Sequence, residues 1–550
     1  MTQHLRTSDH PILLVSCRVS ITKALRMSSL IKQRGTWASF CRRGTAVISR
    51  SLCSSSIQGQ VSSRTPLEEE LRNARPTSEI PGPKAYPLVG SMPKLIKYSN
   101  SKNDIHKMYL KLHDDYGPIF RMIVPGMQPI SVVSDPDDFE TLLRSTMHNP
   151  LRMPLSCLKA VREESSFYEE GMGIMIENGD EWWRVRSKVQ TPMMKPKLVG
   201  TYLQQMDQVS IEFTDRIAQL QADHGEMPDN FLFEMNKWAL ESVGLVALNR
   251  RLGCFRDDLA EDSESLRLIR VIHDIIKAVN DAEMSLKLWK IVRTPSFKKL
   301  KRKHDLLLEI AMRHIQETEA AILAKDPDSG DELSLMENLM TVGLSKKDVV
   351  TLIEDMLFAS IDTTSNTLGF LLYLLARNPE VQAKLQAEVD TVLGDHQGPL
   401  LPRHLAQFSY MKCVFKESLR IFPPGLGIGR ALEKDTVLGG YIVPKGDMVM
   451  YLGIIAPMDE TMFPRAKEFI PDRWSRDRPL GPIHPYASLP FSTGTRMCIG
   501  RRIAEQEMYT FLARIMQRFT VDYKHRDMDI QFRILFRPSE PLRFSFTERK

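Results

Sequence analysis

Cysteines are few in this sequence, and their placement excludes two common uses. Seven are scattered over 550 residues, and no two form a C-x-x-C pair. An odd number without such spacing argues against a disulfide framework and a zinc site, and it favours a reducing compartment. Long hydrophobic runs are also missing, because PILLV at residues 11–15 is too short to span a bilayer and no later segment is long enough. The chain has no G-x-G-x-x-G dinucleotide fingerprint either.

Acidic residues are nearly absent from the first 67 residues. This leader has ten Lys or Arg, thirteen Ser and one acid, Asp9, and the next acid is Glu68. Such a composition is typical of an organelle transit peptide, although a disordered basic tail without a specific role has the same composition. The leader contributes +9 to a formal net charge of +6, which leaves −3 for the rest of the chain. We therefore predict no nucleic-acid partner.

The rest of the chain is predicted to be mostly helical with small β-sheets. Residues 68–90 end in IPGPKAYPLVG, whose prolines and glycines predict a stiff, extended lead-in to a single domain over residues 91–550. A helix that stops at Gly117 precedes two strands around a turn at Pro125 and Gly126. Helical patterns dominate the middle of the domain, and strand-like pieces such as TVLGGYIVPKG return towards its end.

One predicted helix is unusually long. Ser345 and Asp348 have the spacing of a capping box, and the helical pattern continues to Arg377. The segment is apolar on most sides, so we expect it to be buried in the core. Its middle nevertheless reads ASIDTTSN, residues 359–366. A polar patch inside a buried helix is costly unless its groups are paired or used in chemistry.

A lone cysteine, Cys498, lies in PFSTGTRMCIGRR, residues 490–502. A thiolate is a soft, strongly donating ligand for iron. Gly494 and Gly500 permit close approach of the loop to a porphyrin, a following helix N-terminus stabilises the thiolate, and Arg496 offers a cation to a haem propionate. Taken alone, a cysteine between glycines is equally a small hydrophobic residue in a turn.

The spacing of this loop is specific. It matches F-x-x-G-x-R-x-C-x-G and resembles the haem-thiolate loop of the cytochrome P-450 family. Further segments resemble motifs of that family, in the family's order and over roughly residues 80–550: DEWWRVR, ASIDTT, KESLR and FIPDRW. The residues that carry these matches are Trp182, Arg186, Glu417, Arg420 and Arg473.

The resemblance implies the cytochrome P-450 fold, with a haem between the long central helix and the Cys loop with its helix. The cofactor is then heme b, and Cys498 is its axial iron ligand. Family motifs further imply a buried Glu–Arg–Arg network of Glu417, Arg420 and Arg473 that supports the loop. They assign the remaining cofactor contacts, mainly to the propionates, to Trp182, Arg186, Arg430, Phe491 and Arg496.

The resemblance also assigns catalysis to Asp362 and Thr363 in the long helix. Splitting dioxygen needs two protons, which an acid with access to water and a relaying hydroxyl can deliver. The alternative for a mid-helix Thr is back-bonding to the preceding turn. Two positions depart from the family pattern: Ser360 stands where the family has Gly, which puts the detail of oxygen binding in doubt, and Ser492 where many members have Gly.

A monooxygenase needs two electrons per turnover, and the chain has no room for a flavin domain, so a separate donor is required. Four cations are predicted to form a basic surface near the iron that steers an acidic donor: Lys412, Lys416, Arg501 and Arg502. Ordinary solvated side chains are the alternative. The pattern resembles the mitochondrial branch of the family, in which the donor is an iron–sulfur ferredoxin, and the transit-like leader agrees with it.

The pocket walls are expected within residues 150–175 and 225–300 and after Pro424, and their apolar composition predicts a lipophilic substrate, steroid-like or xenobiotic. The stretch at 286–304 mixes Trp289, Ile291, Val292 and Phe297 with basic residues, which fits either a membrane surface or a solvated helix. We expect a peripheral enzyme on the matrix side of the mitochondrial inner membrane.

Two other functions are open to this sequence. A haem-thiolate isomerase or dehydratase rearranges peroxides without external electrons, but the intact Asp-Thr pair and the basic surface argue against it. A non-catalytic haem or lipid carrier would release its ligand unchanged.

Overall fold

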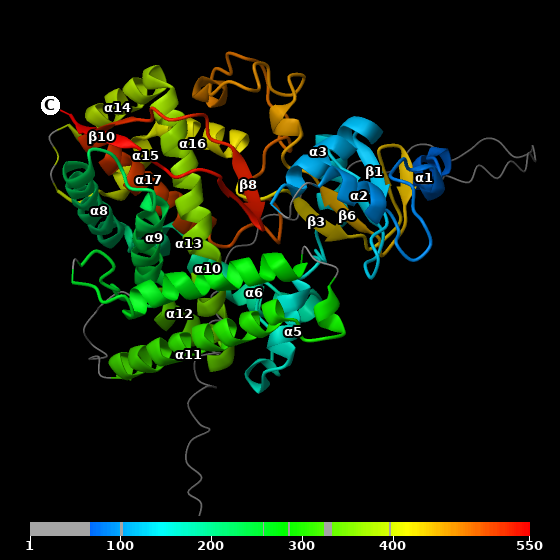
Figure 1. The fold of residues 1–550 in the computed structure, drawn as a ribbon, viewed down its shortest axis with the longest axis horizontal. Coiled ribbons are helices and arrows are strands. Elements are labelled where there is room, and N and C mark those ends of the chain that lie inside the picture. The colour runs from blue at the N-terminus through cyan, green and yellow to red at the C-terminus, as the bar shows by residue number, and fades with distance from the viewer. Residues whose placement is uncertain are drawn as a thin grey trace, which may run out of the picture. The chain divides into compact units, whose positions relative to one another are not determined.

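The computed structural model describes residues 66–99, 103–256, 258–283, 287–323, 333–394, 396 and 398–549. The predicted leader lies outside these residues up to residue 65. Most of the described chain is helical (Figure 1). The α-helices are α1 Pro66–Asn73, α2 Met92–Tyr98, α3 Ile105–Tyr116, α4 Pro136–Ser145, α5 Ser156–Glu163, α6 Gly179–Met194, α7 Pro196–Gly200, α8 Leu203–His224, α9 Phe231–Ala247, α10 Glu264–Glu283, α11 Pro295–Leu323, α12 Leu335–Thr341, α13 Lys346–Arg377, α14 Pro379–Leu393, α15 Pro402–Gln407, α16 Ser409–Ile421 and α17 Arg501–Arg518.

The described strands are short and form small sheets, as predicted. One sheet has the order β1-β2-β6-β3, with β2 and β6 parallel and the other neighbours antiparallel. The pairs β4–β5, β7–β10 and β8–β9 are antiparallel. The strands are β1 Ile119–Met122, β2 Ile130–Val133, β3 Ile428–Ala431, β4 Thr436–Leu438, β5 Tyr441–Val443, β6 Met448–Tyr451, β7 Phe519–Asp522, β8 Ile530–Arg533, β9 Leu535–Pro538 and β10 Ser545–Glu548.

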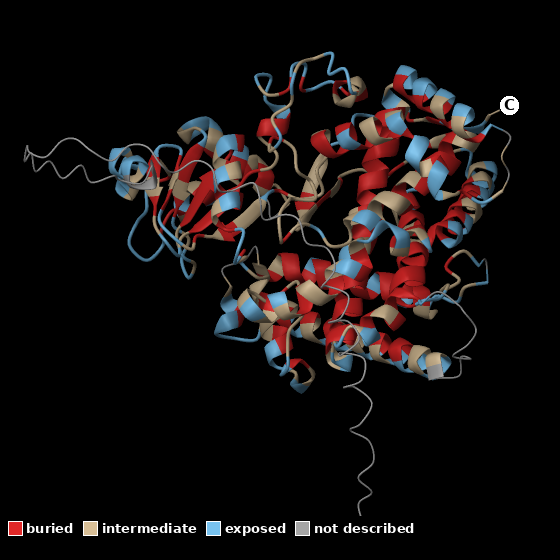
Figure 2. Ribbon diagram, turned by 180° about the vertical axis from the view of Figure 1, so that it is seen from behind, coloured by how far each residue is buried: buried red, intermediate tan, exposed pale blue. Residues whose placement is uncertain are grey.

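Helix α13 is the predicted long helix. Its capping box is present: the Asp348 N–H donates to Ser345 Oγ at 3.1 Å, and the Ser345 N–H donates to the Asp348 carboxylate at 3.0 Å. Most of its side chains are buried, and buried residues, drawn red, dominate the interior of the molecule (Figure 2). The expectation of a buried central helix that ends at Arg377 is therefore confirmed.

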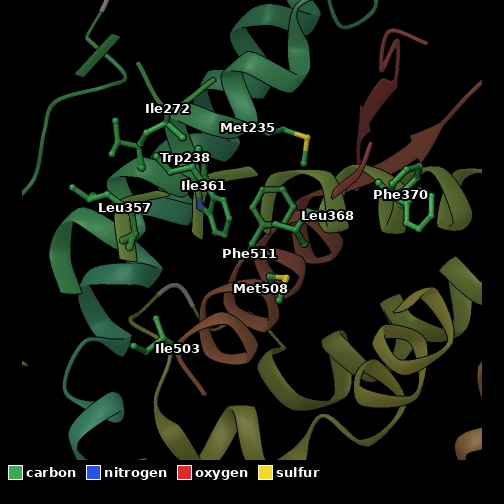
Figure 3. Packing of buried hydrophobic residues seen from close by; sticks show 14 of the residues in the cluster. Met235, Trp238, Ile272, Leu357, Ile361, Leu368, Phe370, Ile503, Met508 and Phe511 are labelled. Carbon is green, nitrogen blue, oxygen red and sulfur yellow. The ribbon is translucent and has the colours of Figure 1, made fainter. Parts of the chain in front are cut away.

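Apolar side chains pack α13 between α9 and α17. Figure 3 shows Leu357, Ile361 and Leu368 of α13 among side chains from the two neighbouring helices. Trp238 of α9 meets Phe511 of α17 edge to face, with ring centroids 4.7 Å apart. Because α17 follows the Cys loop directly, this packing fixes the start of α17, and therefore the loop, relative to the middle of α13.

A second, polar contact holds α13 against α5 and α11. Arg162 Nη2 lies 2.7 Å from Asp355 Oδ1, and His304 Nε2 lies 3.0 Å from Glu354 Oε1, all four residues being buried. The Tyr168 hydroxyl donates to the other Glu354 oxygen at 2.5 Å. Burial raises the pKa of Glu354 to about 7, against the charge of Arg162, which lowers it. This cluster is expensive to break, because removal of Arg162 would leave two carboxylates buried without a cation.

The segment from 287 to 304 divides into buried and exposed residues. Trp289 and Phe297 stack with centroids 5.2 Å apart and are 3 % and 1 % exposed, so they belong to the core and are not available to a membrane. Ile291 and Val292, in contrast, are 85 % and 66 % exposed. The two aromatic residues therefore fit neither of the alternatives, a membrane surface or a solvated helix, that the sequence left open for this stretch. None of the helices in the described residues combines the length and apolarity that a membrane crossing needs.

Candidate functional site

The Cys loop is closed by backbone hydrogen bonds. The Cys498 N–H donates to the Phe491 carbonyl at 2.9 Å, and the Met497 N–H donates to the Gly494 carbonyl at 3.1 Å. Helix α17 begins at Arg501, three residues after the cysteine. The side chain of Cys498 is exposed, so a ligand can reach its sulfur.

The glycine positions of the loop differ in what they require. Gly494 has a φ of +79°, which favours glycine, whereas Gly500 has a φ of −81°, which any residue adopts. Ser492, which replaces a glycine of the family pattern, has a φ of +59°, and its buried hydroxyl has no partner. A non-glycine residue in that region costs about 1–2 kcal/mol. The departure at Ser492 is therefore tolerated with backbone strain.

Opposing influences act on the thiol. The surrounding protein raises the pKa of Cys498, although one side of the sulfur is open. The backbone N–H groups of Gly500 and Arg501 and the charges of Arg152 and Arg186 lower this pKa. The predicted N–H groups at the start of α17 thus act on the sulfur, and two arginine charges act in the same direction, but burial outweighs them because the net shift of this pKa is upward.

Four arginines gather beside the loop without a carboxylate partner in the described residues: Arg152, Arg186, Arg430 and Arg496. Arg186 Nη2 donates to the Met497 carbonyl at 2.9 Å, next to the cysteine. Arg496 donates to the Glu177 carbonyl at 2.7 Å, and its guanidinium lies 4.4 Å from the ring centre of Trp182. Five of the six predicted cofactor residues therefore belong to the loop or contact it directly. The sixth, Arg430, lies close enough for its charge to act on Arg496.

This cluster is poorly satisfied as it stands. Burial and then the charges of the other three arginines lower the pKa of Arg496 to about 8, and burial lowers the pKa of Arg430 to about 9. The Nε atoms of Arg186, Arg430 and Arg496 are buried without a hydrogen-bond partner. Unpaired buried cations are unfavourable. A pair of carboxylates, such as the two propionates of a haem, would offset the repulsion and accept the missing hydrogen bonds. The residues present therefore fit a haem.

Helix α13 opens at one place along its buried length. Ala359 is exposed and Phe358, Ser360 and Thr363 are partly exposed, whereas the residues on either side are buried. The Thr363 hydroxyl donates to the carbonyl oxygens of Ala359 at 2.8 Å and Ser360 at 3.1 Å. The back-bonded arrangement of a mid-helix threonine is thus present, and it leaves the oxygen lone pairs free to accept a proton. Of the predicted polar patch, Ser360 and Thr363 lie on this accessible face, whereas the remaining polar residues of the patch are buried.

Asp362 points away from that face and has a partner on α10. Its Oδ1 lies 3.0 Å from Nε2 of His273, and the side chains are 11 % and 35 % exposed. Asp362 was predicted to have access to water. It is nearly buried, but it contacts a more exposed histidine that the sequence did not reveal. No signal in the sequence could have found His273, because it lies 89 residues away.

A buried carboxyl links α13 to the helix behind the Cys loop. The Thr364 hydroxyl donates to Oε1 of Glu507 in α17 at 2.9 Å, while Oε2 has no partner. Burial raises the pKa of Glu507 to about 8. Since Thr364 follows Thr363, this bond ties the open face of α13 to α17, nine residues beyond Cys498 in sequence.

The predicted Glu–Arg–Arg network is confirmed and is wholly buried. Glu417 accepts from Nε and Nη2 of Arg420 at 2.9 and 2.8 Å, and from Nε of Arg473 at 2.9 Å. The Ile470 N–H and the Trp474 indole N–H also donate to this carboxylate, at 3.0 and 2.7 Å. The remaining guanidinium N–H groups donate to backbone carbonyls of residues 457–468. The network thus holds that irregular segment against α16.

The four predicted surface cations differ in their pairing. Arg501 and Arg502 lie 2.8 and 3.8 Å from Glu505, so their charge is partly balanced. Lys412 and Lys416 pair with no carboxylate among the described residues. The ring of Tyr509 in α17 meets the ring of Phe415 in α16 edge to face, with centroids 5.3 Å apart, so the two helices that carry these cations are neighbours. The net positive charge of this surface therefore rests on the two lysines.

Comparisons with known proteins agree with this geometry. The family described as Cytochrome P450 matches residues 80–546. The chain is 32 % identical over 490 residues to "Probable cytochrome P450 301a1, mitochondrial" of Drosophila melanogaster, covering 87 % of this chain and 88 % of the relative. It is 33 % identical over 504 residues to "Probable cytochrome P450 12a5, mitochondrial" of the same species, covering 88 % and 92 %. It is 32 % identical over 506 residues to "Cytochrome P450 CYP12A2" of Musca domestica, covering 88 % and 93 %.

Proposed function

The chain belongs to the cytochrome P450 family, whose members are generally haem monooxygenases with a thiolate-ligated iron, and we propose that it inserts one atom of dioxygen into a lipophilic substrate with electrons from a ferredoxin. The observation that carries this proposal is the arginine cluster beside the exposed thiol of Cys498, whose buried cations have no carboxylate partner in the part of the chain that the structure describes. A ligand that joins a soft metal to two carboxylates satisfies both features.

In this proposal Cys498 ligates the iron, and Trp182, Arg186, Arg430 and Arg496 hold the propionates, with Phe491 beside the ring. Arg152 joins them, because it shares their surroundings and its charge acts on Cys498. A bound haem supplies the redox chemistry that activates dioxygen. The chain's own task is to hold the thiolate, to exclude bulk water from the substrate and to deliver protons.

Proton delivery is assigned to Asp362 and Thr363. Thr363 lies on the accessible face of α13 and can accept a proton on its hydroxyl oxygen while it donates to Ala359. Asp362 lies one residue away and faces solvent through His273. A carboxyl near water followed by a hydroxyl near the reacting atoms is a relay for general acid catalysis.

Thr363→Ala is expected to retain haem but to divert most NADPH oxidation into hydrogen peroxide, because the last group of the relay is lost. General acid groups contribute about 10²–10⁴-fold, so we expect product formed per NADPH to fall about tenfold or more. Thr351→Ala is the matched control, since Thr351 back-bonds to Lys347 in the same helix at the same 2.8 Å. Equal coupling in the two variants would remove Thr363 from the relay.

The ferredoxin is proposed to bind where Lys412 and Lys416 leave uncompensated charge. Replacing both lysines by Glu should raise the KM for ferredoxin at least about tenfold at low salt without changing the haem spectrum, since steering charges act on association. Lys524→Glu is the control, because Lys524 lies beyond the far end of α17, a helix of 18 residues that is about 27 Å long. An unchanged KM in the double variant would place the donor elsewhere.

Turnover assays separate this function from its rivals. With a ferredoxin, its reductase and NADPH, a monooxygenase yields one oxidised product and consumes dioxygen. An isomerase or dehydratase would instead convert hydroperoxides without NADPH, and a carrier would release its ligand unchanged. We propose a mitochondrial location because two of the relatives are named mitochondrial, and a place on the matrix side of the inner membrane is part of the same proposal. Exposed Leu288, Ile291 and Val292 support a peripheral membrane contact.

A further inference from the structure

Asp362 lines a pocket of about 320 Å³ that the cofactor site does not account for. The walls of this pocket come from the start of α9, from α10, from the middle of α13 and from the β8–β9 hairpin with the loop after it. Neither Thr363 nor Cys498 lines it. His273 lines it with a side chain that is 35 % exposed. Solvent therefore reaches the Asp362 carboxylate on a side that the Cys loop does not share.

Hydrogen bonds fix the orientation of the histidine. His273 Nε2 lies 3.0 Å from Asp362 Oδ1 and 2.9 Å from the side-chain amide of Asn236. The same amide lies 2.5 Å from the Ser365 hydroxyl, which also donates to the Ile361 carbonyl at 2.7 Å. One ring nitrogen cannot accept from an amide N–H and also donate to a carboxylate.

Turning the amide over resolves this conflict, because its oxygen and nitrogen are interchangeable in position. His273 Nε2–H then donates to two acceptors, the Asp362 carboxylate and the amide oxygen of Asn236. The amide nitrogen of Asn236 donates to the Ser365 hydroxyl. Ser365 keeps its donation to Ile361. Each of these contacts then joins one donor to an acceptor, and in this arrangement His273 donates its Nε2 proton to Asp362.

The other charged groups of the pocket are paired with an arginine or, in the case of Arg537, belong to a guanidinium that does not give up a proton. Arg537 faces it from β9, and burial lowers the pKa of Arg537 while the charge of Asp362 raises it. Glu540 and Asp229 are each paired with an arginine. Among the described residues that line the pocket, His273 alone has two ring nitrogens, through which a proton can pass, and is in direct contact with Asp362.

We propose that His273 is the proton gateway of this enzyme, passing protons from water in the pocket to Asp362. This inference rests on the function proposed above. Water protonates His273 Nδ1, the Nε2 proton passes to Asp362 Oδ1, and Asp362 releases a proton towards Thr363. His273 then returns to its starting tautomer by exchange with pocket water. Only N–H and O–H bonds are made and broken, so the sequence moves one proton and no electrons.

The variant His273→Gln tests the gateway in the full-length holoenzyme. Glutamine keeps an N–H that can donate to Asp362 but cannot carry a proton through. With ferredoxin, reductase and NADPH, we expect product per NADPH to fall about tenfold and peroxide release to rise.

A second assay replaces ferredoxin, NADPH and dioxygen by added hydrogen peroxide. Its oxygen is already reduced and protonated, so turnover in this assay should stay within about twofold of the parent enzyme.

His525→Gln is the matched control, because His525 Nε2 lies 2.9 Å from Glu226 and its side chain is 33 % exposed. Normal coupling in His273→Gln would show that the histidine only orients Asp362 and would overturn the proposal. Loss of peroxide-driven turnover as well would also overturn it, since the site itself would then be damaged. Absence of product from the parent enzyme under both conditions would instead refute the monooxygenase function.

Discussion

Cys498→Ala is expected to abolish the absorption band that a reduced, CO-bound haem shows only when a thiolate is its ligand. The Cys498 sulfur is the one open thiol beside the arginine cluster among the described residues, and the loop that presents it is held by backbone hydrogen bonds and by the Arg186 side chain on the Met497 carbonyl. Alanine therefore keeps the loop and removes only the ligand. Substrate oxidation with ferredoxin and NADPH should fall below detection, because metal-bound sulfur is central to the chemistry.

Cys413→Ala is the control for this variant. Cys413 is a free, half-buried cysteine in α16, and no hydrogen bond of its side chain supports the site. It should keep both the CO band and turnover. An unchanged CO band in Cys498→Ala would show that iron is held by another residue, and the proposed roles of Arg186 and Arg496 would fall with it. A band shifted to the position of a nitrogen-ligated haem in the parent protein would have the same consequence.

Features with a local sequence signal were predicted well. The capping box of Ser345 and Asp348 uses residues three apart, and the long helix begins where that box predicts. Glu417 and Arg420 are also three apart, so one helix turn brings them together. Arg473 joined them in the prediction only through the family resemblance, because nothing in the 52 residues between Arg420 and Arg473 encodes the contact.

Contacts between distant segments could not be predicted from the sequence. Arg152 belongs to the arginine cluster because the chain before α5 lies beside the Cys loop, and His273 reaches Asp362 because α10 crosses α13. Composition also failed to separate Trp289 from Ile291, which are two residues apart but 3 % and 85 % exposed. Burial depends on which side of a short turn faces the core, and a mixed apolar and basic stretch does not state it.

Glu417→Gln is expected to have the largest effect on folding of any single side-chain change proposed here. Glu417 is 0 % exposed, and Arg420 and Arg473 are 0 % and 1 % exposed. Among the described residues, Glu417 is the only carboxylate that balances these two arginines. Glutamine nearly preserves volume, but it removes the charge and turns one acceptor into a donor that faces guanidinium N–H groups. Removing one partner of a buried ion pair costs about 3–5 kcal/mol.

The loss should appear as a lower urea midpoint of unfolding and as a smaller fraction of protein that retains haem, since the network holds residues 457–468 against α16. Glu468→Gln is the control: Glu468 pairs with Arg465 across the same three-residue spacing, but the side chains are 53 % and 58 % exposed. An exposed pair of this kind contributes about 0–1 kcal/mol. If both variants unfolded at the same urea concentration, the buried carboxylate would not stabilise this segment. The hydrogen bonds from Arg420 and Arg473 to backbone carbonyls would then hold residues 457–468 in place without Glu417.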